Sequence, residues 1–167
     1  AKDLPRKIVV ESCRRLPLSA KQRELYGRAI ELFKRRNEPG AIAPFKNHLG
    51  LLHYLRLICT DPRRHGLDVF RPEPLAEYRT RATKLDWLLA ELKKIERSGE
   101  KVIVFCEFRN IQRLLQHYVE EAFGIRADII NGDTTASAAH AQSRQKRIKA
   151  FQAKPGFGVI ILSPVAV

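Results

Sequence analysis

The sequence predicts a three-layer α/β fold with a parallel sheet in its second half, preceded by a helical segment. In the first half, apolar residues recur only at helical spacing. In the second half, short apolar runs rich in β-branched residues alternate with helix-like stretches. This alternation is typical of parallel strands joined by crossover helices. A hydrophobic content of 44% over 167 residues is sufficient for a buried core.

The first helix is predicted to begin at Ser19, whose hydroxyl can cap it. Gln22 follows at the position that completes a capping box. Apolar residues then recur at helical spacing as far as Phe33. The basic run 34–37 suits the negative end of the helix dipole, and Pro39-Gly40 ends the helix.

A second helix is predicted from Pro44 to Cys59, followed by an irregular connection over residues 61–80. The apolar residues of this helix lie three apart: Leu49, Leu52, Leu55 and Ile58. The connection is rich in proline, which is unfavourable for helices and central strands. The predicted organisation is therefore a helical appendage with its connection over residues 1–80, and an α/β lobe over residues 81–167.

The α/β lobe is predicted to begin with a helix over residues 85–95 that ends at Gly99, a natural C-terminal cap. The apolar run 101–106 predicts a buried parallel strand. The next helix covers residues 111–119 and ends at Gly124.

Two further strands complete the predicted lobe. The second strand covers residues 126–130 and the third covers residues 159–162. Between them, Ser137 is expected to cap a helix that reaches Phe151. Three strands joined by helices in this way form a parallel sheet.

The composition makes nucleic acid the first partner to consider. The chain has 31 Lys and Arg against 18 Asp and Glu, a net charge of +13 and a pI of about 10.1. Its three cysteines lie far apart, which favours a reducing compartment over a disulfide framework or a zinc site. No apolar run approaches the length of a membrane span. We expect no membrane partner and a cytoplasmic location, associated with the nucleoid in a bacterium or nuclear in a eukaryote.

Ligands of open parallel sheets bind beyond the carboxyl ends of the strands, which selects three loops. The candidate residues are Glu107, Phe108, Arg109 and Asn110 after the first strand, Gly132, Asp133, Thr134 and Thr135 after the second, and Ser163 after the third. Backbone N–H groups at helix starts, together with hydroxyls, suit phosphate oxygens. The alternative is that these residues form ordinary turns and helix caps.

Four cations lie close together on the last predicted helix. Arg144 and Arg147 share one face, beside Lys146 and Lys149. They either contact phosphates or form a solvated helix surface. The sequence has no G-x-x-x-x-G-K-[ST] loop, no H-E-x-x-H and no G-x-S-x-G. We therefore expect no catalytic residue, no nucleotide cradle and no metal site within this chain.

A series of segments, in order, resembles the second motor lobe of Swi/Snf-type ATPases. These segments are Leu4-Pro5-Arg6-Lys7, Leu18-Ser19 with Gln22 and Leu25-Tyr26, Leu55 to Pro62, Thr83-Lys84-Leu85, Lys101 to Phe108, Asn131 to Thr134, Arg144 with Ile148 and Phe151, and Val159 to Ser163. The segment from Lys101 resembles helicase motif IV, and the segment from Val159 resembles the start of motif V. The stretch from Gly132 to Arg144 is longer than in the family, with an Ala-rich insertion.

The resemblance implies a RecA-like second lobe, here partial, with a helical insertion ahead of motif IV. In that family a first RecA-like lobe binds ATP and Mg, and hydrolysis between the two lobes drives translocation along double-stranded DNA. The loops at 107–110 and 131–135 would contact the DNA backbone. By the same resemblance the chain is expected to be cut within motif V. The residues that act on ATP would then lie outside it, and the isolated chain would be inactive.

Two alternatives stay open. The chain could be the second lobe of an RNA helicase, although such lobes normally reach motif IV without a helical insertion. It could also be a stand-alone basic α/β module that binds nucleic acid without a motor partner. The sequence leaves the biological task open, since remodelling, repair, transcription recycling and defence all use this motor.

Overall fold

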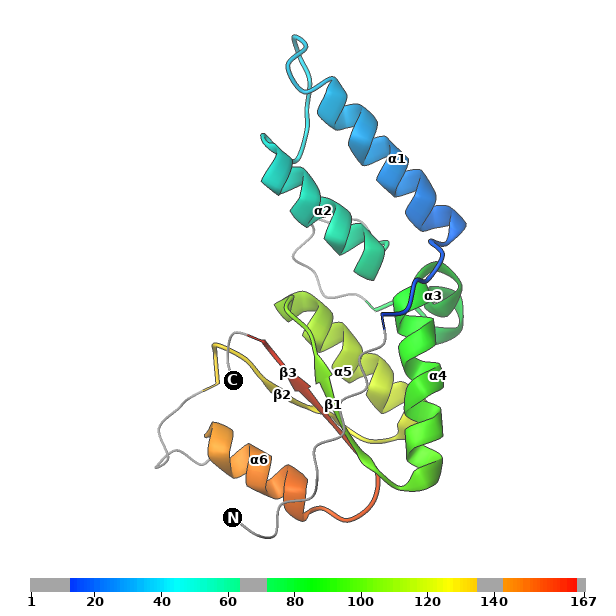
Figure 1. Cartoon of the computed structure of the whole chain (residues 1–167), viewed down its shortest axis with the longest axis vertical. Helices are drawn as coiled ribbons and strands as arrows, with labels where there is room; N and C mark the ends of the chain where they lie inside the picture. Colours follow the sequence, from blue (N-terminus) through cyan, green and yellow to red (C-terminus); the bar gives the residue numbers. More distant parts are fainter. Residues whose placement is uncertain (1–12, 64–71, 135–142, 165–167) are drawn as a thin grey trace.

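The computed structural model describes residues 13–63, 72–134 and 143–164 (Figure 1). We call residues 13–63 the helical unit, and residues 72–134 with 143–164 the α/β unit. Figure 1 shows the helical unit at one end of the molecule, with the sheet and its covering helices at the other.

The helical unit consists of two helices that pack side by side, α1 (Ala20–Lys34) and α2 (His48–Thr60). The capping box predicted at the start of α1 is confirmed, because the Ser19 hydroxyl accepts from the Gln22 N–H at 3.1 Å and Gln22 Oε1 accepts from the Ser19 N–H at 3.1 Å. The small core between the helices contains Ala29, Phe33, Phe45, Leu51, Leu55 and Ile58.

The start and the buried face of α2 differ from the prediction. The helix begins at His48 and is capped by Asn47, whose side chain accepts from the Gly50 N–H at 2.8 Å. Leu49 and Leu52 are 76% and 56% exposed. A strict spacing of three drifts around a helix of 3.6 residues per turn, so only the later members of the predicted stripe stay on the buried face.

The connection between the units is more regular than predicted. A short helix, α3 (Leu75–Arg81), occupies the end of the segment that the sequence suggested was irregular. It begins directly after Pro74, where a proline is compatible with a helix start. Its Tyr78 is buried and fixes α3 on the core of the α/β unit.

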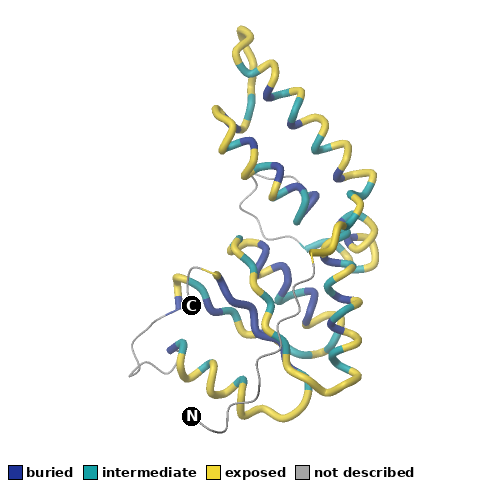
Figure 2. Tube along the Cα trace, viewed as in Figure 1, coloured by how far each residue is buried: buried dark blue, intermediate teal, exposed yellow. Residues whose placement is uncertain are grey.

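Within the described residues, the sheet contains three parallel strands, β1 (Lys101–Phe105), β2 (Asp128–Ile130) and β3 (Gly158–Leu162), in the order β1-β3-β2. The last strand in the sequence is therefore the middle strand of the sheet, and it is buried along its whole length. Figure 2 shows this concentration of buried residues. The predicted parallel sheet is confirmed, but the burial predicted for the first strand is wrong, since Ile103 and Phe105 of β1 are 52% and 60% exposed. The second strand also begins later than predicted, at Asp128.

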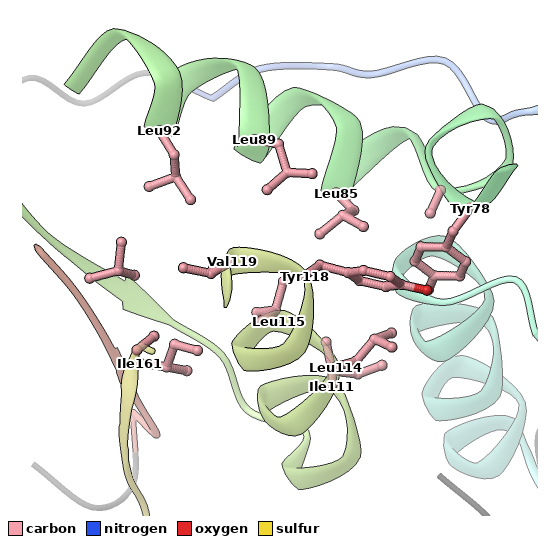
Figure 3. Close-up of a cluster of buried hydrophobic side chains, with 13 residues drawn as sticks. Tyr78, Leu85, Leu89, Leu92, Ile111, Leu114, Leu115, Tyr118, Val119 and Ile161 are labelled. Carbon is pink, nitrogen blue, oxygen red and sulfur yellow. The ribbon is translucent and has the colours of Figure 1, made fainter. Parts of the chain in front are cut away.

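Helices cover both faces of the sheet. On one face, α4 (Thr83–Ser98) and α5 (Arg109–Phe123) enclose the main core (Figure 3). Both helices end as predicted, at Gly99 and Gly124. These two glycines adopt φ values of 68° and 64°, the left-handed conformation that glycine accommodates best.

The other face of the sheet is covered by α6 (Arg144–Ala153), whose Phe151 packs on the small cluster formed by Ile130, Ile160 and Leu162. The start predicted for this helix is wrong. It begins at Arg144 and is capped by Ser143, which accepts from the Lys146 N–H, whereas Ser137 lies outside the described residues. The three-layer architecture is nevertheless the one expected.

One buried glutamine of α1 joins the helical unit to the α/β unit. Gln22 Nε2 donates to the carbonyls of Ile58 and Cys59, both at 3.1 Å. Its Oε1 accepts from the Thr83 hydroxyl at 3.2 Å. Because Gln22 is completely buried, leaving these groups unpaired would be costly. This side chain therefore ties the end of α2 to the start of α4.

A second buried joint is centred on Asp61. The Tyr78 hydroxyl donates to Asp61 Oδ1 at 2.7 Å, and Arg63 Nη2 pairs with Oδ2 at 2.6 Å. Burial raises the pKa of Asp61, but the hydrogen bonds from Arg63 and Tyr78 outweigh burial and hold it below its ordinary value. The Tyr78 ring stacks on Tyr118 of α5, with centroids 5.0 Å apart. Burial raises the pKa of Tyr118 to about 12.

Across the described ranges, no helix is both long and apolar enough to cross a membrane.

Candidate nucleic-acid interface

The three strands end at the same level of the sheet. Phe105, Leu162 and Ile130, the last residues of β1, β3 and β2, are partners in the strand register. The pairing continues one residue further, because Cys106 N–H donates to the Leu162 carbonyl and Ser163 N–H donates to the Ile130 carbonyl, both at 2.9 Å. The loops that follow the strands therefore leave the sheet side by side, as the sequence predicted.

A buried glutamine connects the loops after β1 and β2. Gln112, on the first turn of α5, is 1% exposed. Its Nε2 donates to the carbonyl of Cys106 at 2.6 Å, and its Oε1 accepts from Asn131 Nδ2 at 2.8 Å. One side chain thus fixes the spacing between the two loops. The sequence pattern did not indicate this role, although Gln112 is a polar residue within an apolar helical stripe.

The loop after β2 is a compact turn built on Asn131. The Asn131 carbonyl accepts from the Thr134 N–H at 2.9 Å, and the Thr134 hydroxyl accepts from the Asn131 N–H at 3.1 Å. Asn131 Oδ1 also accepts from the Asp133 N–H at 3.0 Å, the side-chain turn that asparagine commonly forms. Thr134 is consequently buried, and its hydroxyl is occupied by the hydrogen bond within the turn.

Arg109 lies across this turn. Its Nη1 pairs with Asp133 Oδ1 at 2.9 Å. A Cβ atom at Gly132 would lie 3.3 Å from the Arg109 guanidinium, tighter than most side-chain contacts. The glycine therefore leaves room for an arginine from the neighbouring loop to approach the turn.

The N-terminus of α5 lies at the same edge of the sheet. Phe108 is its capping residue, and the Phe108 side chain makes no capping hydrogen bond to the first N–H groups of the helix. Arg109 and Asn110 are exposed there. A helix start with uncapped N–H groups and a neighbouring cation can hold a phosphate group.

Glu107 and Phe108 point toward the helical unit. Glu107 forms an ion pair with Arg56 of α2. The Phe108 ring packs edge-on against His53, with centroids 5.3 Å apart, and the Arg56 guanidinium lies 5.5 Å from the same ring. Two residues of the predicted loop are therefore contacts between the two units, which the sequence alone did not indicate.

A groove of about 510 Å³ opens beside β1 and borders this loop. Among the described residues, β1 pairs with a strand on one side only. Trp87, Phe105 and Phe108 line the groove, and Arg56 and Glu107 also lie on its wall. A ligand can therefore reach the ion pair between Arg56 and Glu107 from the surface.

The two arginines of α6 contact β2 and the loop that follows it. Arg144 Nε donates to the Thr134 carbonyl at 3.2 Å, and Arg147 Nη1 donates to the Ile129 carbonyl at 3.1 Å. Both are partly buried, whereas Lys146 and Lys149 are exposed. The lysines therefore form the outward cationic surface of α6.

The remaining predicted residues are less accessible. Ser163 is buried and offers its N–H to the Ile130 carbonyl. Thr135 lies outside the described residues.

Cys106 directly precedes the loop after β1. Burial raises the pKa of its thiol, which lies 3.8 Å from the Phe108 carbonyl. A raised pKa keeps the thiol protonated and unreactive. In the described part of the chain, no three His, Cys, Asp or Glu residues are grouped to hold a metal ion.

The fold built from these elements is that of the RecA-like C-terminal lobe of SWI2/SNF2 ATPases. The SWI2/SNF2 ATPase C-terminal domain of Sulfolobus solfataricus superposes with a TM-score of 0.62, over 87% of this chain and 59% of that domain, at 17% identity. A structure from the yeast class II Hda1 HDAC complex superposes with a TM-score of 0.50, over 87% of this chain and 49% of the other, at 16% identity. The predicted fold class is therefore confirmed.

A curated sequence is much more similar to this chain. Zorya protein ZorD of Escherichia coli O139:H28 is 46% identical over 170 aligned residues, which include the whole of this chain. The chain spans 15% of the length of that relative. No protein-family model matches the sequence.

Proposed function

We propose that this chain is the second motor lobe of an ATP-dependent translocase or remodelling helicase that acts on double-stranded DNA. Its strand-end loops would grip the phosphate backbone of the duplex. The observation that carries the proposal is the arrangement at the carboxyl edge of the sheet. There the start of α5, Arg109 and the Asn131 turn lie together.

The chemistry of this edge suits phosphate groups. The first N–H groups of α5 present partial positive charge, and Arg109 offers a planar set of donors that matches phosphate oxygens. Lys146 and Lys149 add exposed cations on α6. Contacts of this kind position a protein on nucleic acid without reading its sequence. A translocase needs such sequence-independent contacts.

We expect ATP and Mg to be held outside this chain. The chain has no glycine-rich phosphate loop with its lysine and hydroxyl. ATP would supply the free energy for movement, and a first RecA-like lobe would hold it. We therefore expect the isolated chain to bind DNA and to show no ATPase activity.

Fluorescence anisotropy with a labelled duplex, over a series of salt concentrations, tests the DNA-binding role. We expect affinity to fall steeply with salt, with a slope of about 0.9 per phosphate neutralised. The Arg109→Met variant should lower the slope, whereas Arg79→Met, in an exposed ion pair of α3 and α4, should leave it unchanged. No binding at low salt would contradict the proposal. Preference for duplex RNA would favour an RNA helicase.

A further inference from the structure

Three consecutive residues after β1 connect the helical unit with the loop after β2. Glu107 forms an ion pair with Arg56 of α2, and Phe108 lies beneath the Arg56 guanidinium at 5.5 Å. Arg109 forms an ion pair with Asp133 at 2.9 Å. Two arginines from different units are therefore held at the two ends of one short loop.

The two ion pairs are alike in exposure. The side chains of Arg56 and Glu107 are 59% and 48% exposed, and those of Arg109 and Asp133 are both 61% exposed. Exposed pairs of this kind contribute little to stability. A carboxylate presents its oxygens to a guanidinium much as a phosphate does. A polyanion can therefore exchange with these carboxylates at little cost.

We propose that Arg56 and Arg109 form one phosphate-binding site that spans the helical unit and the α/β unit. Glu107 and Asp133 are internal competitors, which occupy the two guanidinium groups until backbone phosphates displace them. This inference rests on the proposed DNA-binding function and assigns a residue of the helical unit to it. It also gives the two carboxylates a role consistent with their charge, since a carboxylate repels phosphate.

The contacts of Phe108 explain why Arg56 remains at the loop when Glu107 is displaced. The ring interacts with the guanidinium face, and His53 packs against the ring edge. Arg56 can therefore exchange its carboxylate partner for a phosphate while it keeps its position over Phe108. DNA bound there would contact both units at once.

Substitutions of the two pairs test this inference in the full 167-residue chain, by duplex binding at several salt concentrations. Arg56→Met should weaken binding about five- to tenfold and lower the salt slope by about one phosphate contact. Glu107→Gln and Asp133→Asn should each tighten binding about two- to fivefold. The matched controls are Arg79→Met and Asp86→Asn, which disrupt an exposed ion pair of the same type away from the strand ends.

The controls decide the outcome for the competing carboxylates. If Glu107→Gln changes affinity no more than Asp86→Asn does, Glu107 is not a competitor. If Arg56→Met behaves as Arg79→Met does while the parent chain binds duplex, the two-arginine site is wrong and the proposed function stands.

NMR spectra of the arginine Nε–Hε groups separate the site from the DNA function. Duplex DNA and tripolyphosphate are titrated in parallel, and both should shift the signals of Arg56 and Arg109. If tripolyphosphate shifts them and duplex does not, the phosphate site stands and the DNA function is wrong. If neither probe shifts the Arg56 signal, the site is wrong.

Discussion

Asn131 and Gln112 lie nineteen positions apart and meet through a 2.8 Å hydrogen bond between their side-chain amides. Gln112 is buried beneath the strand ends and also donates to the Cys106 carbonyl. The loops that we propose contact DNA are therefore held at a fixed distance by one side chain that does not itself reach the surface.

The Gln112→Leu substitution should destabilise the chain and free the loops after β1 and β2 to move relative to one another. It leaves the Cys106 carbonyl and the Asn131 amide without their partner, at a cost of about 2 kcal/mol in the free energy of unfolding. DNA affinity should fall roughly three- to tenfold, because the loops are no longer pre-organised. Gln116→Leu is the control, since Gln116 donates to the Ala127 carbonyl outside the loops. Denaturant unfolding and anisotropy measure the two effects. Equal affinity in both variants would contradict the assignment.

The Asp61→Asn substitution should destabilise the junction of the two units. Asp61 is buried and pairs with Arg63 and the Tyr78 hydroxyl. Removing one charge of a buried pair leaves the other uncompensated, which costs about 3 kcal/mol. Asp86→Asn, in an exposed pair, should change the free energy of unfolding very little. Similar unfolding midpoints for the two variants would show that the Asp61 pair is unimportant.

The same carboxylate predicts an acid dependence of stability. The pKa of Asp61 is lower in the folded chain than its unfolded value of about 3.9. Its contribution is therefore present above pH of about 4 and is lost as the pH falls through the folded-state pKa. Urea unfolding between pH 6 and pH 3 should show a steeper loss of stability for the parent chain than for Asp61→Asn. Parallel curves would indicate that another group controls acid unfolding.

The basic residues of α6 should differ in whether they contribute to stability or to DNA binding. Arg147 donates to the Ile129 carbonyl, so Arg147→Met should cost about 1 kcal/mol of stability. Lys146 and Lys149 are exposed, so their joint replacement by Met should leave the free energy of unfolding unchanged. That double replacement should lower the salt slope of DNA binding by up to about 0.9 per lysine. A slope that responds only to Arg147 would reverse this assignment.

The sequence predicted those elements whose ends have local causes. The capping box of Ser19 and Gln22 and the left-handed Gly99 and Gly124 each depend on a few neighbouring residues. The strands were predicted from β-branched runs. Their alignment at one edge follows from the parallel pairing of β3 with both neighbours, which a single sequence pattern implies only in general terms.

Other elements were missed because their causes are distant. The proline-rich connection predicted irregular structure where α3 lies, because α3 depends on Tyr78 packing against Tyr118. The spacing of three in α2 suggested a buried Leu49 and Leu52, but the partner helix determines which face is covered.

The sequence predicted where the residues of the candidate site lie, but not which side chains they contact. The strand-end rule located Arg109 and the Gly132 turn correctly beside one another. It could not show that Glu107 pairs with Arg56, 51 positions earlier in the chain. Nor could it show that Arg144 donates to the loop after β2 and Arg147 to β2 itself. Such long-range pairs depend on the packing of separate units.

The position of β3 has a consequence for synthesis of the chain on the ribosome. Among the residues that the structure describes, β1 and β2 do not pair with each other, and each pairs with β3, which follows both of them in the sequence. The contacts between α1 and α2 involve nearby residues and can form as soon as both helices emerge. The sheet has to wait until β3 has left the exit tunnel. Until then β1 and β2 lack this partner strand, and unpaired strand edges favour aggregation.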